Sequence, residues 1–337
     1  MSTITTTSTF LPDTGLRSRL RPVAYARTPA ALLLVLLLFA ALRGPHLFTS
    51  AGLGGAIASA APLILAAMAL TPIAMVGRGS VDLAIGPLMG FINVTLMQFL
   101  VANGVNAPIK LISFALVTGV IVEVIMGLTI AWLRVEPIIV ALAGYLVLAG
   151  LNLVIMPKPT GQAPAWLTAW GSGRSVFSPM LIVLLVAFLL WWGFTKTAVY
   201  THLRLTGSNE RTAYVSGIPI STMRVTSHAV GGVFAGLAGL AFTGLIGSGD
   251  ATQGTTYTLI AVTALVLGGT SLGGGAGGAL GSVIGAIDIF LISYVLATFN
   301  LGSLSSFVVQ LTYGVVLVAA LMVTVFLGRS RQRKALS

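Results

Sequence analysis

The feature that most constrains this chain is a succession of apolar segments, each close to the length needed to cross a lipid bilayer. About ten such segments follow one another, and a helix of about 20 apolar residues spans the ~30 Å hydrocarbon core. They are continuous runs rather than the alternating pattern of barrel strands. The sequence therefore predicts an all-α, polytopic transmembrane helical bundle. The predicted spans cover residues 30–42, 53–76, 81–101, 109–133, 138–156, 179–197, 225–246, 257–273, 279–299 and 304–327.

The overall composition agrees with a membrane location. Apolar residues make up 56% of the chain and charged residues only 7%, against roughly a quarter in soluble domains. Because cysteine is absent, neither a disulfide framework nor a thiolate metal site can form.

Basic residues gather next to the first and last apolar segments. By the positive-inside rule, these clusters predict cytoplasmic N- and C-termini and an even number of spans. We divide the chain into a cytoplasmic N-terminal tail (1–29), a transmembrane permease domain (30–327) and a cytoplasmic basic tail (328–337). The two clusters are Arg17, Arg19, Arg21 and Arg27, and Arg329, Arg331, Arg333 and Lys334.

Two glycine-rich interruptions break the hydrophobic pattern in similar positions, at residues 77–80 before the third segment and 268–275 before the ninth. Interruptions at matching points of two halves often mark an internal repeat and its substrate path. The alternative is that both are tight cytoplasmic turns between hairpin helices. The sequence leaves both interpretations open.

No constellation of catalytic or metal-binding residues is present. No glycine precedes a lysine anywhere in the chain, so the G-x-x-x-x-G-K-[ST] loop that cradles nucleotide phosphates is missing. The three histidines lack the helical spacing of a zinc site and are interpreted as loop or interface residues. We predict neither catalytic nor metal-binding residues.

Three acidic residues lie in or beside the apolar segments, where an ionisable group is costly and usually functional. Glu123 and Asp288 lie well inside segments, and Asp82 opens the third. An ion-coupled secondary transporter would use them as an ion relay. The alternative is a helix–helix hydrogen bond for Glu123 or Asp288 and a helix cap for Asp82.

A polar loop at residues 200–224 separates the sixth and seventh segments. A short helix-forming stretch, 210–216, lies in it between Gly207 and a break at 217–219. Such a short, charged helix suits docking into a groove on a cytoplasmic partner.

Three motifs of this chain resemble those of a known family. Residues 79–86 match G-G-I-D-L-S-x-G except that Ala84 replaces Ser, and residues 264–275 match VVLGGTSLxGG closely. The loop matches G-x-N-E-x-A-A-x-x-S-G-I, with Thr212 in place of the first Ala. Its matching positions are Gly207, Asn209, Glu210, Ala213, Ser216, Gly217 and Ile218.

With these motifs, residues from about 53 to 326 resemble the permease subunits of ABC sugar importers of the ribose, xylose and galactose class. That class shares a superfamily with branched-chain amino-acid permeases. The resemblance implies a non-enzymatic subunit of the inner membrane that translocates a simple sugar, pentose- or hexose-like. A branched-chain amino acid or another small polar solute is the alternative substrate, and an ion-coupled secondary transporter is the alternative function.

The resemblance also implies partners for the chain. These are a cytoplasmic ABC ATPase that holds ATP and Mg, an extracytoplasmic solute-binding protein that delivers the sugar, and a second permease subunit in a homo- or heterodimer. The chain itself is expected to bind membrane lipid, no cofactor and no nucleic acid.

Site residues carry over from the matching motifs. The loop positions above, together with Arg211, are the expected ATPase-coupling residues. Asn93, Gln98, Asn152 and Gln310 are chosen instead as polar residues in or beside predicted spans, and either sugar contact or helix–helix hydrogen bonding fits each of them. The candidates for the translocation path are Asp82, Gly86, Asn93, Gln98, Gly268, Gly269, Thr270 and Ser271.

Overall fold

The computed structural model describes residues 26–299 and 302–336, which form helices and no strand beyond one isolated bridge between Thr160 and Gly249. Every predicted apolar segment contains a helix, whereas most of the predicted N-terminal tail lies outside the described residues. The α-helices are α2 (Arg27–Arg43), α3 (Ser50–Met75), α4 (Ile85–Thr95), α5 (Pro108–Trp132), α6 (Pro137–Ile155), α7 (Ala165–Gly171), α8 (Pro179–Thr195), α9 (Ala198–Ser208), α10 (Glu210–Val215), α11 (Ile220–Ile246), α12 (Tyr257–Leu267), α13 (Ala279–Ala297) and α14 (Ser305–Leu336).

Short helical turns extend or connect several of these helices. A π-helical turn, η3 (Leu96–Leu100), and a 3₁₀ turn, η4 (Val101–Asn103), prolong α4, and η5 (Gln253–Thr256) leads directly into α12. The others are η2 (Pro45–Phe48) and η6 (Gly302–Leu304).

The described residues contain six helices long and apolar enough to cross a membrane, or seven if the bent pair α8 and α9 is one span. The prediction of about ten full spans is therefore not confirmed. Helix α12 is too short, because its 11 residues rise only about 16 Å. Its predicted segment ends instead in the glycine-rich stretch that begins at Gly268. Helix α14 continues to Leu336 and so includes most of the predicted basic tail.

Helices α5 and α11 pack together through glycine. A Cβ on Gly119 would lie 2.4 Å from the carbonyl oxygen of Gly232, and one on Gly236 would lie 2.8 Å from that of Ala115. Small residues let helix backbones approach this closely, which favours helix association in lipid.

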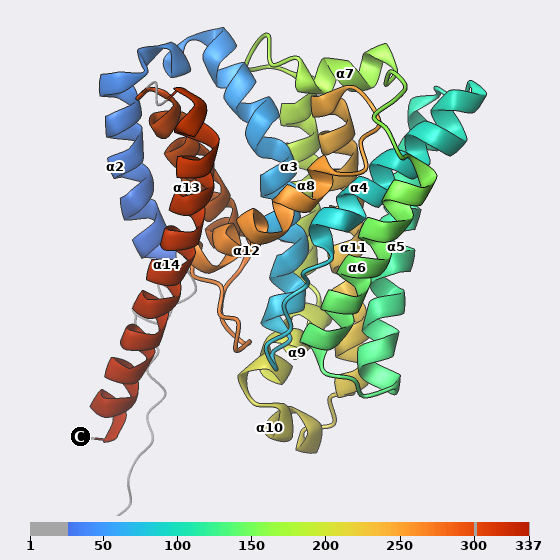
Figure 1. Ribbon diagram of the computed structural model, residues 1–337. Helices are drawn as coiled ribbons and strands as arrows, with labels where there is room; N and C mark the ends of the chain where they lie inside the picture. Colours follow the sequence, from blue (N-terminus) through green and yellow to red (C-terminus); the bar gives the residue numbers. More distant parts are fainter. Residues whose placement is uncertain (1–25, 300–301, 337) are drawn as a thin grey trace, which may run out of the picture.

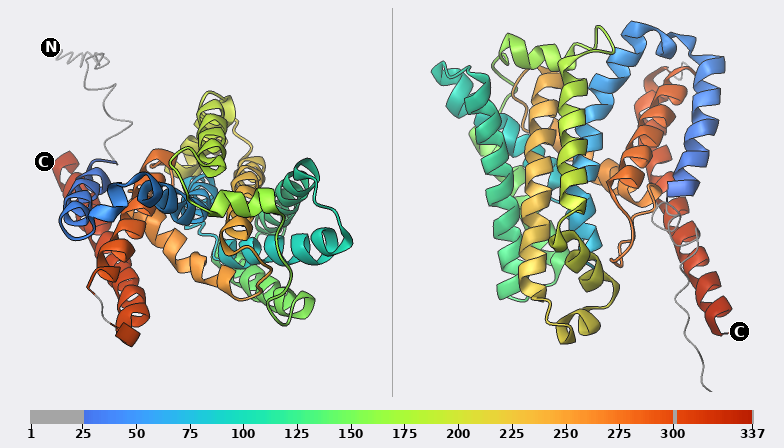
Figure 2. Two further views of the ribbon diagram at one scale, coloured as in Figure 1. Left: turned by 90° about the horizontal axis from the view of Figure 1, so that it is seen from above. Right: turned by 180° about the vertical axis from the view of Figure 1, so that it is seen from behind.

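Helices α2, α13 and α14 form a group on one side of the molecule, and the bundle that includes α3 to α6, α8 and α11 forms the other (Figure 1). Two further views show the same separation, with α12 crossing between the groups (Figure 2). A small second core of Ala40, Leu47 and Leu291 joins α2 to α13. Helix α10 and the C-terminal end of α14 lie at the same end of the molecule, the α10 end, while α7 lies at the opposite, α7 end (Figure 1).

Candidate functional site: the junction at the α10 end

Helix α10 is a separate six-residue helix because Asn209 both ends α9 and caps α10. Asn209 has extended backbone dihedrals, and its Oδ1 accepts a hydrogen bond of 3.0 Å from the Thr212 amide. Asn is a preferred N-cap because its side chain satisfies an otherwise unpaired helix amide. The helix ends at Val215, and the chain turns away from it at Gly217, whose φ of +80° favours glycine. The short helix predicted from the loop motif is confirmed.

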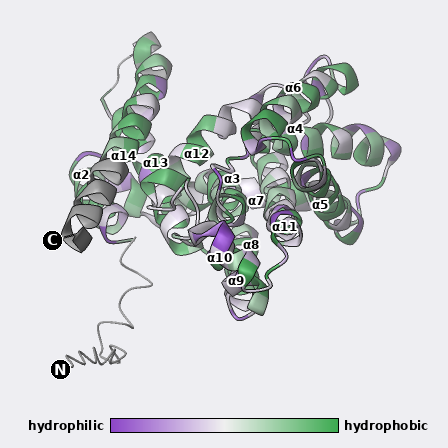
Figure 3. Ribbon diagram, turned by 90° about the horizontal axis from the view of Figure 1, so that it is seen from below, coloured by the Kyte–Doolittle hydropathy of each residue, from purple (hydrophilic) through white to green (hydrophobic). Residues whose placement is uncertain are grey.

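The coupling loop exposes some of its expected residues and buries others. Ala213 and Ile218 are 3% and 6% exposed, so they anchor α10 to the core. Arg211, Ser216 and Gly217 are exposed. Two large side chains that the motif did not single out, Tyr214 and Val215, are 72% and 74% exposed. Helix α10 is also the most hydrophilic labelled helix at this end of the molecule (Figure 3).

Glu210, the first residue of α10, connects three elements through ion pairs. Its Oε1 lies 2.8 Å from Arg224 Nη2 near the start of α11, and its Oε2 lies 3.4 Å from Arg78 Nε in the first glycine-rich interruption. The Arg224 side chain is only 11% exposed, against 55% for Arg78. The Arg224 pair is therefore the stronger tie, since solvent screens the exposed pair.

Both glycine-rich interruptions meet the coupling loop at one point, which we name the glycine junction: Gly77, Gly207, Gly274 and Gly275. A Cβ on Gly207 would lie 2.5 Å from the nitrogen of Gly275, and one on Gly274 would lie 2.3 Å from the Cα of Gly77. The Gly275 amide also donates a hydrogen bond of 2.9 Å to the carbonyl of Met75. Backbone packs on backbone here, so the three segments cannot move independently without breaking the junction.

A cavity of about 680 Å³ opens beside the junction at the α10 end. Four arginines and two glutamates line it, which gives it net positive charge. These charged residues are Arg78, Arg134, Arg211, Arg224, Glu136 and Glu210.

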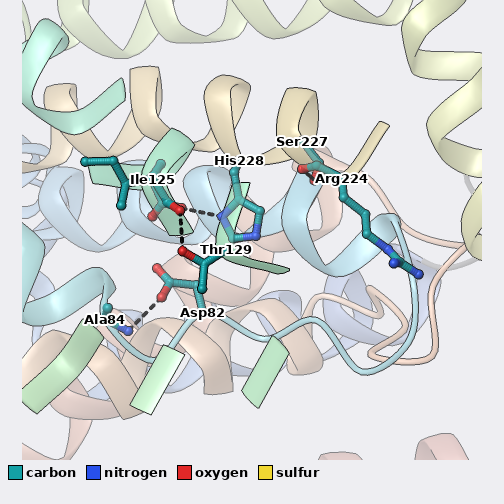
Figure 4. Close-up of polar contacts among 8 residues, drawn as sticks. Asp82, Ala84, Ile125, Thr129, Arg224, Ser227 and His228 are labelled. Carbon is teal, nitrogen blue, oxygen red and sulfur yellow. Dashed lines mark hydrogen bonds and ion pairs between the residues drawn. The ribbon is translucent and has the colours of Figure 1, made fainter. Parts of the chain in front are cut away.

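The eight candidates for the translocation path do not form one site. Asp82 lies next to the first interruption, where its Oδ1 accepts a hydrogen bond of 2.7 Å from the Ala84 amide, immediately before α4 (Figure 4). Gly86 is covered by η5 and α12, because a Cβ there would lie 2.4 Å from Thr258 Oγ1. Gln98, in η3, is exposed.

Four further candidates lie in the second interruption. Gly268 packs against α13, where a Cβ would lie 2.3 Å from the Gly281 carbonyl, and Gly269 has a φ of +79°. Thr270 is buried and lies 3.2 Å from Ser282 Oγ. The hydroxyl of Ser271 accepts a hydrogen bond from the Gly273 amide and so closes the turn.

Asn93 is the candidate with the most hydrogen bonds. Its Nδ2 donates to Thr243 Oγ1 at 3.1 Å and to the Ser248 carbonyl at 2.9 Å, and its Oδ1 accepts from the Asp250 amide at 2.8 Å. Asn152, by contrast, donates to the Pro87 carbonyl at 3.0 Å. Both polar side chains thus make structural bonds between segments. Whether any of the eight candidates contacts substrate stays a prediction.

A buried pair of titratable residues, Glu123 and His228, was not predicted. Glu123 Oε2 lies 2.6 Å from His228 Nδ1, and the two side chains are 0% and 5% exposed. Asp82 lies beside the His228 ring (Figure 4). The structure thus shows a helix–helix contact for Glu123, one of the two interpretations that the sequence left open, and places His228 in α11 rather than in a loop. The sequence analysis named no partner for Glu123, and only the tertiary structure shows that His228 lies next to it.

The pairing follows from the glycine contact between α5 and α11. Because Gly119 contacts Gly232 and the two helices run antiparallel, the residue four positions after Gly119 faces the residue four positions before Gly232. Those residues are Glu123 and His228. The contact could have been found from the sequence only if the pairing of these two helices had been known.

Asp288 differs from Glu123. It is fully buried in α13, and neither of its carboxylate oxygens has a hydrogen-bond partner among the described residues. The helix–helix hydrogen bond expected for Asp288 is therefore wrong for this part of the chain.

Comparison with known proteins places the chain among membrane permeases. It is 29% identical to the ribose import permease protein RbsC of Escherichia coli (strain K12) over 298 residues, 86% of this chain and 91% of that protein. It is 32% identical over 237 residues to the galactofuranose transporter permease protein YtfT of Escherichia coli (strain K12), 68% of this chain and 67% of that protein. No solved structure matches the chain.

A third relative is the autoinducer 2 import system permease protein LsrC of Escherichia coli (strain K12 / DH10B). The chain is 32% identical to it over 283 residues, which cover 81% of this chain and 78% of that protein. The family model described as branched-chain amino acid transport system / permease component matches residues 52–326. With its several apolar helices, this multi-pass membrane protein belongs to the family of branched-chain amino acid transport system permease components.

Proposed function

We propose that this chain is the membrane-spanning permease subunit of an ATP-binding cassette importer for a simple sugar. Relatives named for the import or transport of ribose and galactofuranose align with most of the chain, and they favour a sugar over a branched-chain amino acid. The chain has no nucleotide-binding loop of its own. Energy is therefore supplied by a separate ATPase that holds ATP and Mg.

The glycine junction is the observation that carries this proposal. The coupling loop, through Gly207, touches both interruptions that precede α4 and α13. A force applied to α10 therefore reaches two membrane-embedded segments through rigid backbone contacts. Interfaces of this kind shift between discrete arrangements rather than deforming continuously.

The ATPase docks on α10 and the cavity beside it. Arg211, Tyr214 and Val215 are exposed there, and exposed aromatic and arginine side chains are typical anchors of protein interfaces. The net positive charge of the cavity favours an acidic partner. Of the coupling residues named from the sequence, Glu210 and Arg211 line this cavity.

The same arrangement orients the chain in the inner membrane. With α10 in the cytoplasm, the C-terminal end of α14 is also cytoplasmic, as the basic cluster predicts, and an extracytoplasmic solute-binding protein delivers sugar to the α7 end. A second permease subunit completes the membrane unit. That the eight translocation path candidates contact the sugar is also part of this proposal.

Uptake measurements in the host organism test the proposal. Deletion of the gene is expected to abolish uptake of at least one labelled sugar among ribose, xylose and galactose. This uptake should stop when ATP is depleted and persist when an uncoupler removes the ion gradient while ATP is maintained. Uptake that collapses with the uncoupler instead would support an ion-coupled carrier, for which Glu123 and His228 are the available buried pair.

Two loop variants test the coupling assignment. Asn209→Ala removes the cap of α10, and Gly217→Ala forces a side chain into a backbone with φ of +80°. Both are expected to reduce uptake while the amount of protein in the membrane stays normal. Gly193→Ala in α8 is the control, because a Cβ there meets nothing within 4 Å. Normal uptake in both loop variants contradicts the assignment.

A further inference from the structure

A cavity of about 530 Å³ lies between the α3–α11 bundle and the group formed by α2, α13 and α14. Its volume is in the range of about 300–1,000 Å³ that small-molecule sites occupy. No acidic or basic side chain lines it. The lining includes Ser59 and Leu63 of α3, Phe242 and Ile246 of α11 and Phe290 of α13.

The cavity lies toward the α7 end. Its lining from α3 lies near the middle of that helix, and its lining from α11 includes Leu245 and Ile246, the last residues of α11. Helix α11 begins next to α10, so these residues are at the far end of the bundle. Under the proposed orientation, this is the side on which solute arrives.

Polar side chains line one wall of the cavity. Gln253 and Thr256 of η5 line it, and so do Tyr313 of α14 and Ser293 of α13, whose hydroxyls form a hydrogen bond with each other. A second cavity of about 390 Å³ shares Thr256 and Tyr313 with the first and adds Gln310. No charged side chain lines the second cavity either.

Aromatic rings supply the other part of the lining. Tyr257 and Phe242 lie edge to face with ring centroids 5.6 Å apart, and both line the first cavity with Phe290 and Tyr313. A neutral sugar requires hydroxyl and amide partners for its hydroxyls and apolar surface for its C–H faces. This lining offers both, whereas an amino acid or an anion would leave its charges unpaired in an uncharged site.

Gln253 is held in place by Asp250. The Gln253 Nε2 donates to Asp250 Oδ2 at 3.0 Å, and the backbone amide of Gln253 donates to Oδ1 at 3.2 Å. Thr252 donates to the same Oδ1 through its amide and its hydroxyl, each at 2.7 Å. Because the amide nitrogen of the side chain is engaged by the carboxylate, the Gln253 Oε1 is left to accept a hydrogen bond from a ligand hydroxyl.

Asp250 is itself fixed and charged. Its amide donates to Asn93 Oδ1 at 2.8 Å, so α4 supports the turn that carries Gln253. Burial alone raises the pKa of Asp250, but the hydrogen bonds from Thr252 and Gln253 outweigh that effect and lower the pKa below its usual value. The carboxylate therefore stays ionised at neutral pH and keeps its hydrogen bonds with Gln253.

We propose that this uncharged cavity is a contact site for a neutral monosaccharide on the outer part of the translocation path. Gln253, Tyr257 and Tyr313 contact the sugar, and Asp250 and Asn93 position Gln253. The inference rests on the proposed function, because it takes the transported solute to be a sugar.

A single-cysteine experiment tests this site, and the chain needs no preparation for it because it has no native cysteine. Thr256→Cys places the only thiol where the two cavities meet, and Asn103→Cys places it in the exposed turn after α4. Right-side-out vesicles with the complete importer are treated with a membrane-impermeant maleimide. D-ribose, D-xylose, D-galactose or L-leucine is added in turn.

At least one sugar is expected to slow labelling of Thr256→Cys, and L-leucine is not. Labelling of Asn103→Cys should be unaffected by any of them. A Thr256→Cys thiol that the maleimide never reaches would identify a lipid-filled crevice and overturn the proposal. Equal labelling rates with and without every sugar would also overturn it.

The positioning role has its own readout. Gln253→Ala should raise the sugar concentration that gives half-maximal protection about three- to tenfold, the loss of one neutral hydrogen bond. Asp250→Asn should raise it similarly, and the double variant should add little. A merely structural role for Asp250 would instead lower the amount of protein in the membrane and leave the half-protecting concentration unchanged.

The sugar uptake assay distinguishes a failure of the proposed function from a failure of the cavity assignment. If deletion of the gene changes uptake of none of the three sugars, the proposed function fails and this site fails with it. If uptake depends on the gene but no sugar protects Thr256→Cys, only the cavity assignment is wrong.

Discussion

Replacing Gly207 by alanine tests whether the glycine junction holds the coupling loop to the membrane-embedded segments. A Cβ at this position would lie 1.9 Å from the Met75 carbonyl oxygen and 2.5 Å from the Gly275 nitrogen. Both neighbours are backbone atoms, so no side-chain rotation relieves the overlap. The segments must separate from 1.9 Å to the 3.4 Å of an ordinary contact, a shift of about 1.5 Å.

The cost has two parts. Overpacking of a filled site destabilises by about 1–3 kcal/mol. A shift of this size also breaks the 2.9 Å hydrogen bond from the Gly275 amide to Met75, worth about 0.5–1.5 kcal/mol. A total of about 1.5–4.5 kcal/mol would make opening of the junction at least about tenfold more frequent, since each 1.4 kcal/mol is a factor of ten.

Thiol labelling measures this opening. Thr270 is 2% exposed and lies in the second interruption, so a Thr270→Cys thiol reacts only when that segment opens. In the Gly207→Ala background, the labelling rate should rise at least about tenfold if labelling follows the open population. The same reporter combined with Gly193→Ala should react at the parent rate. An unchanged rate in the Gly207→Ala background would refute the view that the junction is tightly packed.

Three further predictions follow from the buried polar groups. Replacing Glu123 or His228 singly by leucine should lower the free energy of unfolding by about 3–5 kcal/mol, because it leaves the other buried partner uncompensated. The double variant should lose less than the sum of the two single variants. Strictly additive shifts in the thermal unfolding midpoint would contradict this. Asn93→Ala should cost about 2–4 kcal/mol, since it leaves the Ser248 carbonyl and the Asp250 amide unpaired, and a midpoint equal to that of the parent would count against it. The lowered pKa of Asp250 stabilises the fold above the unfolded value of about 3.9, and this stabilisation is lost as the pH falls through the native pKa. Asp250→Asn should therefore flatten the acid limb of stability against pH, and an acid limb as steep as the parent's would argue against that role.

The loop motif and the glycine interruptions were the most informative parts of the sequence for the site. The Asn209 cap and the Gly217 turn are local features, because their hydrogen bonds and dihedrals involve neighbours in the chain. They could therefore be predicted from residue order. That both interruptions meet Gly207 could not be predicted, since the contacts join residues about 70 and 130 positions apart.

The span prediction was accurate for helix type and less so for length. Continuous apolar runs require helices in lipid, because every backbone group must be satisfied within the segment. The apolar run that includes α12 continues to Gly268, but the helix ends at Leu267, because Gly269 turns the chain with a φ of +79° and Gly268 packs closely against the backbone of Gly281 in α13. Hydropathy records how apolar a segment is and says nothing of what packs against it.

The sequence by itself determined that this is a helical membrane protein with a capped, charged loop helix and no nucleotide-binding loop of its own. Only the tertiary structure decided that Glu123 faces His228, that Asp250 holds Gln253 beside an uncharged cavity, and that Gly207 joins two distant interruptions. The physical reason is the range of the interactions. Helix formation and capping depend on residues within one or two turns, whereas a binding surface depends on which helices pack together and in what register.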